Sequence, residues 1–272
     1  MRKHHLTVAL IFAIPGFALA ASAARPQAPA PAPLQVPAGF DIAFAMNALY
    51  GNYDAAVGTS TSTAPATGLE HTNFQPGQKV TVKPFFAAAS STTGEVFLAT
   101  FAVPANGEFD CHACAPLIGA AVFVKSGDAW KLEASEKPDI IFGQYGVPAA
   151  AQLFQFGPRH NGIELSYTYG GQGVTDTHVI FLVAWKGGFS QAWSGIVSSD
   201  NSGYCGAQAP SPCYAYHVNL KFEEGLVPGY DDLTVTTAGT DLSSDSQNGI
   251  RSVIGVQHLR FSDGKYVPQP RP

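Results

Sequence analysis

Two cysteines flanking a histidine form the motif with the most distinctive chemistry in this 272-residue sequence, Cys111-His112-Ala113-Cys114. A c-type haem needs a histidine directly after the second cysteine, and that position holds Ala115. A thiol–disulfide oxidoreductase places such a motif at a helix N-terminus, whereas Pro116 and the apolar run after it indicate a turn and a strand. Zinc needs further Cys or His ligands at close spacing, which do not follow here. The motif is therefore most typical of a structural disulfide loop.

The chain has four cysteines, which form two local pairs, Cys111 with Cys114 and Cys205 with Cys213. An even number of cysteines in an exported chain favours disulfides. We favour the local pairing, because both segments resemble loops that a disulfide would stabilise. Pairing across the two loops stays an alternative, and it would restrict the unfolded chain more.

Three other histidines, His178, His217 and His258, fall in segments that resemble strands. If three imidazoles from one sheet converged, with His112 as a further candidate, they would form an open zinc site for hydrolysis. Strand spacing does not by itself bring such side chains together, so scattered surface histidines are the favoured interpretation. We therefore assign no catalytic residue, no cofactor and no metal, and keep these four histidines as candidate ligands only.

Acidic and glycine-rich patterns carry less information. Asp231-Asp232 follows a Pro-Gly turn and could bind calcium, although two exposed turn carboxylates are the commoner case. Gly170-Gly171-Gln172-Gly173 lies between two predicted strands. A phosphate loop precedes a helix, so these glycines predict a hairpin connection instead. A carboxylate pair for glycoside hydrolysis is conceivable, but no spacing selects one.

Aromatic side chains gather around the second cysteine pair. Exposed rings there would stack on a sugar or pack on a protein partner, whereas buried rings would fill the core. The residues concerned are Trp185, Trp193, Tyr204, Tyr214 and Tyr216.

The N-terminal segment predicts export. Arg2 and Lys3 precede an apolar stretch from Leu6 to Leu19, and two A-x-A cleavage patterns follow. This is the pattern of a signal peptide, here residues 1–23, and its apolar part is shorter than the ~20 residues of a spanning helix. Residues 24–39 are rich in Pro and Ala and predict an extended linker. The expected location is periplasmic or secreted, with no membrane span after cleavage.

Residues 40–272 predict a single β-rich globular domain that begins with one short helix. The helix spans Asp41 to Tyr50, with apolar residues at helical spacing, Asp41 as its cap and Gly51 at its end. Val57–Gly68 has the composition of a loop. Short β-branched and aromatic runs separated by turn residues then predict about ten antiparallel strands. These strands are Gly94–Val103, Ile118–Lys125, Ala129–Ala134, Gln152–Phe156, Gly162–Tyr169, Thr177–Trp185, Ser190–Ser198, Tyr214–Phe222, Leu233–Thr237 and Val253–Phe261.

This order of elements predicts an antiparallel β-sandwich, with a β-barrel or small propeller as the alternative. A hydrophobic content of 46% is enough for a sizeable core. The formal net charge is −5 and there is no basic run, which argues against a nucleic-acid partner.

Three segments together resemble a group of uncharacterised exported bacterial proteins. They are Cys111-His112-Ala113-Cys114-Ala115-Pro116, the Gly-Gly-Gln-Gly turn, and Phe261-Ser262-Asp263-Gly264-Lys265-Tyr266. The resemblance implies no activity. We therefore expect a non-enzymatic binding or interaction protein with an unknown protein or carbohydrate partner. The alternatives are an exported hydrolase, with a His-lined metal site or a carboxylate pair, and a periplasmic thiol–disulfide protein.

Overall fold

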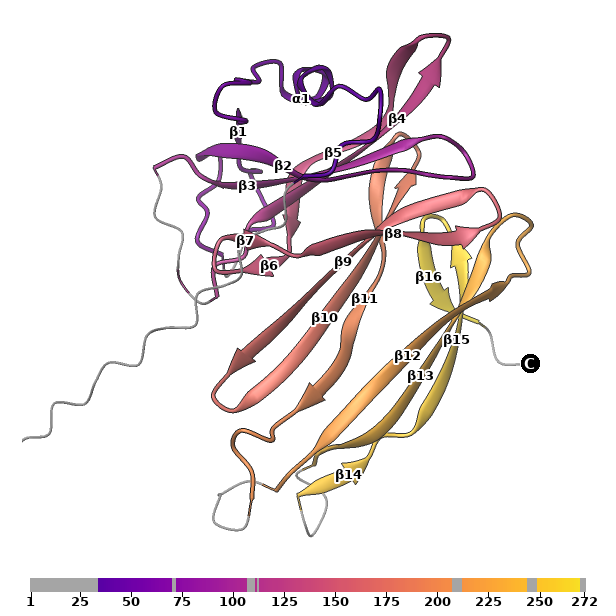
Figure 1. Cartoon of the computed structure of the whole chain (residues 1–272). Coiled ribbons are helices and arrows are strands. Elements are labelled where there is room, and N and C mark those ends of the chain that lie inside the picture. The colour runs from indigo at the N-terminus through magenta and orange to yellow at the C-terminus, as the bar shows by residue number, and fades with distance from the viewer. Residues whose placement is uncertain are drawn as a thin grey trace, which may run out of the picture.

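A computed structural model describes residues 34–69, 72–106, 111, 113–206, 212–243 and 249–269. The predicted signal peptide, most of the predicted linker and His112 lie outside these ranges. The described chain is mainly β with one short helix (Figure 1), and its strands pair antiparallel. The predicted antiparallel β-sandwich with one N-terminal helix is confirmed.

The helix α1 (Ile42–Tyr50) begins and ends where the sequence indicates. Asp41 Oδ1 accepts a hydrogen bond from the Ala43 N–H at 2.8 Å, which satisfies a free donor of the first turn. Gly51 adopts a φ of 74° and donates its N–H to the Asn47 carbonyl, a left-handed C-terminal cap. A helix this short is stabilised mainly by packing, and here the inner face of α1 carries Ala45 and Met46, which are both fully buried.

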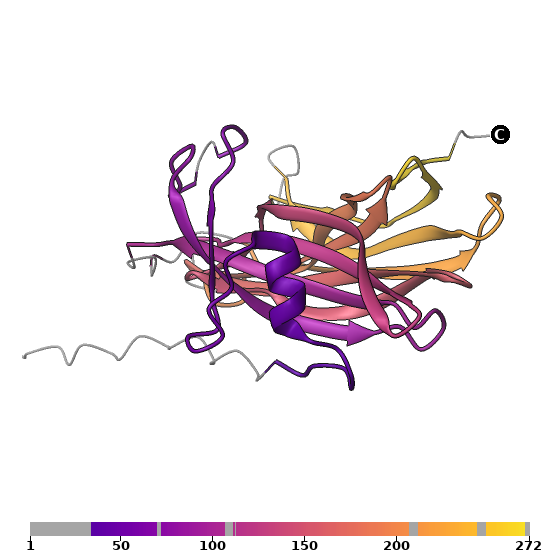
Figure 2. The same ribbon diagram turned by 90° about the horizontal axis from the view of Figure 1, so that it is seen from above.

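Five strands form the first sheet, which lies under α1 (Figure 2), in the order β1-β2-β3-β4-β5. Side chains from α1 and from one face of this sheet make the first core cluster, among them Met46, Leu98 and Phe123. The strands are β1 (Ser60–Thr63), β2 (Lys79–Ala89), β3 (Val96–Pro104), β4 (Leu117–Ser126) and β5 (Ala129–Ile141).

Strand β1 corrects the prediction that Val57–Gly68 is only a loop. Its sequence, Ser-Thr-Ser-Thr, has no apolar alternation that would indicate a strand. Two contacts hold it in place. It pairs with the N-terminal half of β2, and the Asn52 amide bonds to both backbone groups of Thr61, at 3.1 and 2.9 Å.

Nine strands form the second sheet, in the order β16-β15-β13-β12-β11-β10-β9-β8, with β14 beside β13. A separate small hairpin consists of β6 (Gly143–Gln144) and β7 (Val147–Pro148). The strands of the sheet are β8 (Ala150–Gly157), β9 (His160–Gly171), β10 (Val174–Trp185), β11 (Gly188–Asp200), β12 (Ala215–Glu224), β13 (Asp231–Leu242), β14 (Ile250–Ser252), β15 (Gly255–Ser262) and β16 (Lys265–Pro268).

The second sheet folds over itself at the junction of β11 and β12. These two strands pair only through Ser198–Asp200 and Ala215–His217, and beyond that point they separate (Figure 1). Strands β8–β11 are therefore covered on one face by the first sheet and on the other by β12–β16. The chain forms four layers, one of helix and three of strands, with a core cluster between each neighbouring pair.

Strand β10 shows how the sequence supports burial on both faces. Ile180 and Leu182 belong to the core against the first sheet, while Phe181 and Val183 belong to the core against β12–β16. Side chains alternate along a strand, so a strand between two layers needs apolar residues at every position. The run from Val179 to Val183 meets that need, and each of its residues is buried.

Among the described residues, no helix combines the length and apolar character needed to cross a bilayer.

Candidate functional site

The Cys111–Cys114 motif forms a disulfide across a tight turn. The Cys114 N–H donates to the Cys111 carbonyl at 3.0 Å, and β4 begins three residues later at Leu117. The Asn73 side-chain amide donates to both sulfur atoms. No helix N-terminus follows the motif to lower a thiol pKa, and Cys114 is buried. The disulfide therefore constrains the turn immediately before the core strand β4.

The candidate histidines occupy separate places in the described structure. His178 on β10 stacks flat on Tyr167, with ring centroids 4.9 Å apart. His217 on β12 is paired with Ala238 and His258 on β15 with Thr234. Ala238 and Thr234 are four residues apart on β13, a distance of about 13 Å along an extended strand. His217 and His258 are therefore well separated. Within the described ranges, no group of three His, Cys, Asp or Glu side chains could hold a metal ion.

Asp231 and Asp232 begin β13, and one oxygen of the Asp232 carboxylate and the backbone carbonyl of Asp231 accept hydrogen bonds from the C-terminal segment. Gln269 Nε2 donates to Asp232 Oδ2 at 2.9 Å, and the Asp231 carbonyl accepts from the Tyr266 hydroxyl at 3.3 Å. Partial burial, together with Glu224 and Asp232, raises the pKa of Asp231. These contacts join the β12–β13 hairpin to the C-terminal strand.

A carboxyl pair that the sequence did not indicate lies on β5. Burial, the nearby charge of Glu136 and a hydrogen bond that protonated Asp139 donates to that carboxylate raise the pKa of Asp139 to about 6. The pair forms because residues 137–139 bulge out of the strand, where three residues face the single Gly119 of β4. The sequence predicted that this strand ends at Ala134, whereas β5 continues through Pro138 to Ile141. Pro138 was the available signal for the bulge, since proline within a sheet is confined to edges and bulges.

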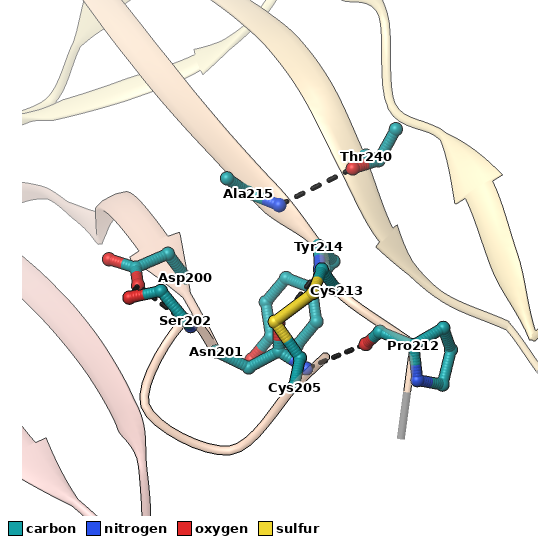
Figure 3. Close-up of a disulfide and its surroundings, with 9 residues drawn as sticks. All are labelled: Asp200, Asn201, Ser202, Cys205, Pro212, Cys213, Tyr214, Ala215 and Thr240. Atoms are coloured by element: carbon teal, nitrogen blue, oxygen red, sulfur yellow. Dashed lines mark hydrogen bonds between the residues drawn. A yellow bond between two sulfur atoms is a disulfide. The ribbon is translucent and has the colours of Figure 1, made fainter. Parts of the chain in front are cut away.

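The second disulfide organises the end of the molecule farthest from α1 (Figure 1). We call this region the stapled tip. It comprises residues 199–205 and 212–216, the β9–β10 turn Gly170–Gly173, and Asp241, Leu242 and Arg251. Cys205 and Cys213 are linked across the connection between β11 and β12 (Figure 3).

Asn201 holds the two ends of this connection together from inside. Its Nδ2 donates to the Pro212 carbonyl and its Oδ1 accepts from the Tyr214 N–H, each at 2.8 Å (Figure 3). The residue is buried, and both its donor and its acceptor are used. Buried, satisfied polar groups of this kind fix one conformation, so the tip is held rigidly by one covalent and two polar links.

The glycine-rich turn predicted between β9 and β10 packs against the disulfide loop. The Gly203 N–H donates to the Gly173 carbonyl at 3.2 Å. A Cβ on Gly173 would lie 2.4 Å from the Tyr204 Cβ, closer than side-chain carbons approach. Gly173 also has a φ of 79°, so both its conformation and its contact require glycine. Two segments about 30 residues apart in sequence thus become neighbours.

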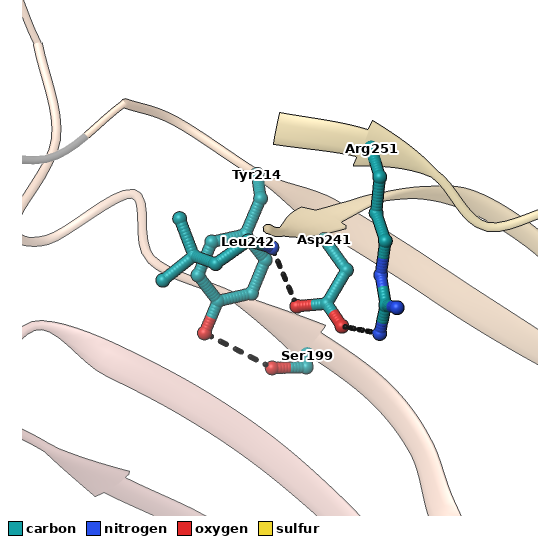
Figure 4. Close-up of polar contacts among 5 residues, drawn as sticks. All are labelled: Ser199, Tyr214, Asp241, Leu242 and Arg251. Atoms are coloured by element: carbon teal, nitrogen blue, oxygen red, sulfur yellow. Dashed lines mark hydrogen bonds and ion pairs between the residues drawn. The ribbon is translucent and has the colours of Figure 1, made fainter. Parts of the chain in front are cut away.

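Tyrosines and carboxylates cluster behind the disulfide. The Tyr214 hydroxyl lies 3.5 Å from Ser199 Oγ (Figure 4), and Ser199 also donates to Asp176. Burial raises the pKa of Tyr216, and the charges of Asp176 and Asp241 add to that effect. Tyr216 therefore stays neutral at physiological pH and presents a hydroxyl group.

One edge of the tip carries an ion pair and an apolar side chain. Asp241 Oδ2 is 3.4 Å from the Arg251 guanidinium (Figure 4), and the apolar Leu242 follows Asp241 at the end of β13. Leu242 is 44% exposed and Tyr204 is 51% exposed. The tip therefore offers a leucine, tyrosine rings and an arginine to solvent on a rigid frame.

The aromatic group noted in the sequence divides between core and surface. Trp185 and Trp193 pack in the core between β8–β11 and β12–β16, which is lined by Phe154, Phe181 and Phe261. Tyr204, Tyr214 and Tyr216 belong to the tip. Of this group, Tyr204 is the residue with the largest exposed fraction, 51%.

No protein-family model matches this chain, and neither the curated proteins nor the solved structures contain a match.

Proposed function

We propose that this chain is an exported, non-enzymatic interaction protein that binds a protein partner through the stapled tip. The observation that carries the proposal is the exposure of Tyr204, on a loop fixed by a disulfide and by Asn201, together with the exposure of Leu242 at the end of β13. Rigid scaffolds commonly carry binding residues on such loops. A rigid loop also loses less conformational entropy on binding.

The residue types favour a protein partner over a sugar. Tyrosine and arginine are enriched in protein interfaces and among the residues that dominate binding energy. Exposed aliphatic side chains add to this, since Ile254 and Val256 are also solvent-exposed just beyond β14. The two disulfides fit an oxidising compartment, and the N-terminal sequence gives the route of export.

Site-directed photo-crosslinking in the native host tests this proposal. A photoreactive amino acid would replace Tyr204, and a matched variant would carry it at Val57, which is 66% exposed and lies near α1. We expect one discrete protein adduct from position 204 and none from position 57. No adduct from position 204, or the same adducts from both, would contradict the proposal. A glycan array that binds the wild type and not Tyr204→Ala would replace the protein partner with a carbohydrate.

A further inference from the structure

A cavity of about 380 Å³ that is open to solvent lies beside the C-terminal end of α1, away from the stapled tip. Its wall combines residues from the helix end, β1, the start of β2 and the bulge of β5. They are Leu49, Tyr50, Asn52, Thr61, Ser62, Thr63, Lys79 and Lys137. The volume is in the range of sites that bind small molecules.

The β5 bulge brings Lys137 to this wall. Residues 137–139 face only Gly119 on β4. A Cβ on Gly119 would lie 2.7 Å from Thr100 Oγ1 and 3.0 Å from the Glu136 carbonyl. A larger residue at position 119 would therefore collide with β3 and with the bulged part of β5. Bulges re-aim side chains and are over-represented next to functional sites.

Hydroxyl groups line the cavity, and the structure supports them from below. The Tyr50 hydroxyl is 2.8 Å from Thr100 Oγ1, which is buried under the bulge. Burial raises the pKa of Tyr50 to about 12, so its hydroxyl is neutral. The Asn52 amide is used by the Thr61 backbone and holds β1 against the helix end. These hydrogen bonds within the protein hold the cavity wall in one conformation before any ligand binds.

The charge of the wall is positive although the chain is acidic. Lys79 and Lys137 line the cavity, and no Asp or Glu does. Among the residues that the structure describes, the ion pairs are Lys186–Asp263, Lys221–Glu223 and Arg251–Asp241, and none of them involves a cavity lysine. Two ammonium groups beside a set of hydroxyls suit an anion that also carries hydroxyl groups.

We propose that this cavity binds a small hydroxylated anion, in which a carboxylate or phosphate contacts the lysines and the ligand hydroxyls face Thr61 and Thr63, the two exposed residues of β1. The shared chemistry is one anionic group on a polyol. This binding site is independent of the stapled tip, so either proposal can fail without the other.

NMR titration of the ¹⁵N-labelled protein tests the proposal with four probes: glucuronate, glucose 6-phosphate, glucose and inorganic phosphate. We expect saturating shifts of the amides at 50–52 and 61–63 with glucuronate or glucose 6-phosphate, at a dissociation constant of about 1 mM or tighter. The probe that saturates identifies the anionic group. Glucose and inorganic phosphate should bind more weakly. Equal shifts with glucose, tighter binding of inorganic phosphate, or no saturation with either sugar anion would overturn the proposal.

Lysine variants separate a built site from general charge attraction. Lys137→Gln and Lys79→Gln should each weaken binding about fivefold, as expected for solvent-accessible charge pairs. Lys131→Gln, an exposed lysine on the same β5 strand that does not line the cavity, is the matched control and should leave binding unchanged. Equal weakening by all three substitutions would overturn the assignment.

Discussion

Gly173 and Gly203 are in direct backbone contact, and this contact fixes the β9–β10 turn to the disulfide loop. The Gly203 N–H donates to the Gly173 carbonyl at 3.2 Å, and a Cβ on Gly203 would lie 2.9 Å from the Gly173 Cα. Neither residue can gain a side chain without separating the two segments. The exposed Tyr204, next in the chain, depends on this contact for its position.

Gly173→Ala should therefore destabilise the fold more than an equivalent change elsewhere. It combines an unfavourable positive φ with a collision against Tyr204, and we expect a loss of about 2–3 kcal/mol in the free energy of unfolding. Gly187→Ala is the matched control, because Gly187 has a similar φ of 82° and nothing within 4 Å of an added Cβ. It should cost about 1 kcal/mol. Urea unfolding measures the free energy of unfolding of both variants. Equal losses in the two variants would show that close contact between the β9–β10 turn and the disulfide loop does not contribute to stability.

The Cys111–Cys114 disulfide should act as a structural staple. Cys111→Ser should lower the free energy of unfolding by about 2 kcal/mol, because the constraint on the unfolded chain is lost. His112→Ala should change it by less than about 0.5 kcal/mol, because the disulfide and not this side chain supplies the constraint. Thiol labelling of the unreduced, denatured protein should find no free thiol. Ready reduction by glutathione, together with catalysis of disulfide exchange on an unfolded substrate, would instead establish a redox enzyme.

The carboxyl pair on β5 predicts a pH dependence of stability. The pKa of Asp139 is raised to about 6 in the folded state, above its value of about 4 in the unfolded chain. The folded state thus favours the protonated group, and stability falls as the pH rises from about 4 to 6. We expect about 1 kcal/mol after allowing for solvent screening.

Asp139→Asn should remove this fall and leave the protein more stable than wild type at pH 7. Urea unfolding at pH 4 and pH 7 measures the effect. Glu133→Gln, an exposed carboxylate change on the same strand, controls for net charge. If Asp139→Asn keeps the wild-type difference between the two pH values, another group is responsible.

Export predicts a processed N-terminus. Mass spectrometry of protein recovered outside the cytoplasm should give a chain that begins near Ala21 or Ala24. Recovery of that material with Met1 intact would contradict cleavage.

Local features of the fold were predictable, because neighbouring residues determine them. Asp41 and Gly51 mark the ends of α1 through their own backbone preferences. Gly187 and Gly264 supply the positive φ that their hairpin turns need. Both disulfides in the structure join the local partners that their spacing favoured.

Long-range relationships were not predictable in the same way. Alternation along β10 indicates which side chains share a face, but not which sheet covers that face. The fold-over between Asp200 and Ala215 depends on three residue pairs, and no local pattern marks it. The tip and the cavity each combine segments that are distant in sequence, so the turn, the loop and the helix could be recognised singly but not as neighbours.

The interaction role of the stapled tip can be measured directly once the protein crosslinked to position 204 is purified. Calorimetric titration of that partner with wild type, Tyr204→Ala and Val57→Ala compares an exposed tip residue with an exposed apolar residue near α1. We expect Tyr204→Ala to weaken binding about tenfold or more, as for an aromatic residue at the centre of an interface, and Val57→Ala to bind as wild type does. Equal affinities of the wild type and Tyr204→Ala would contradict binding through the tip.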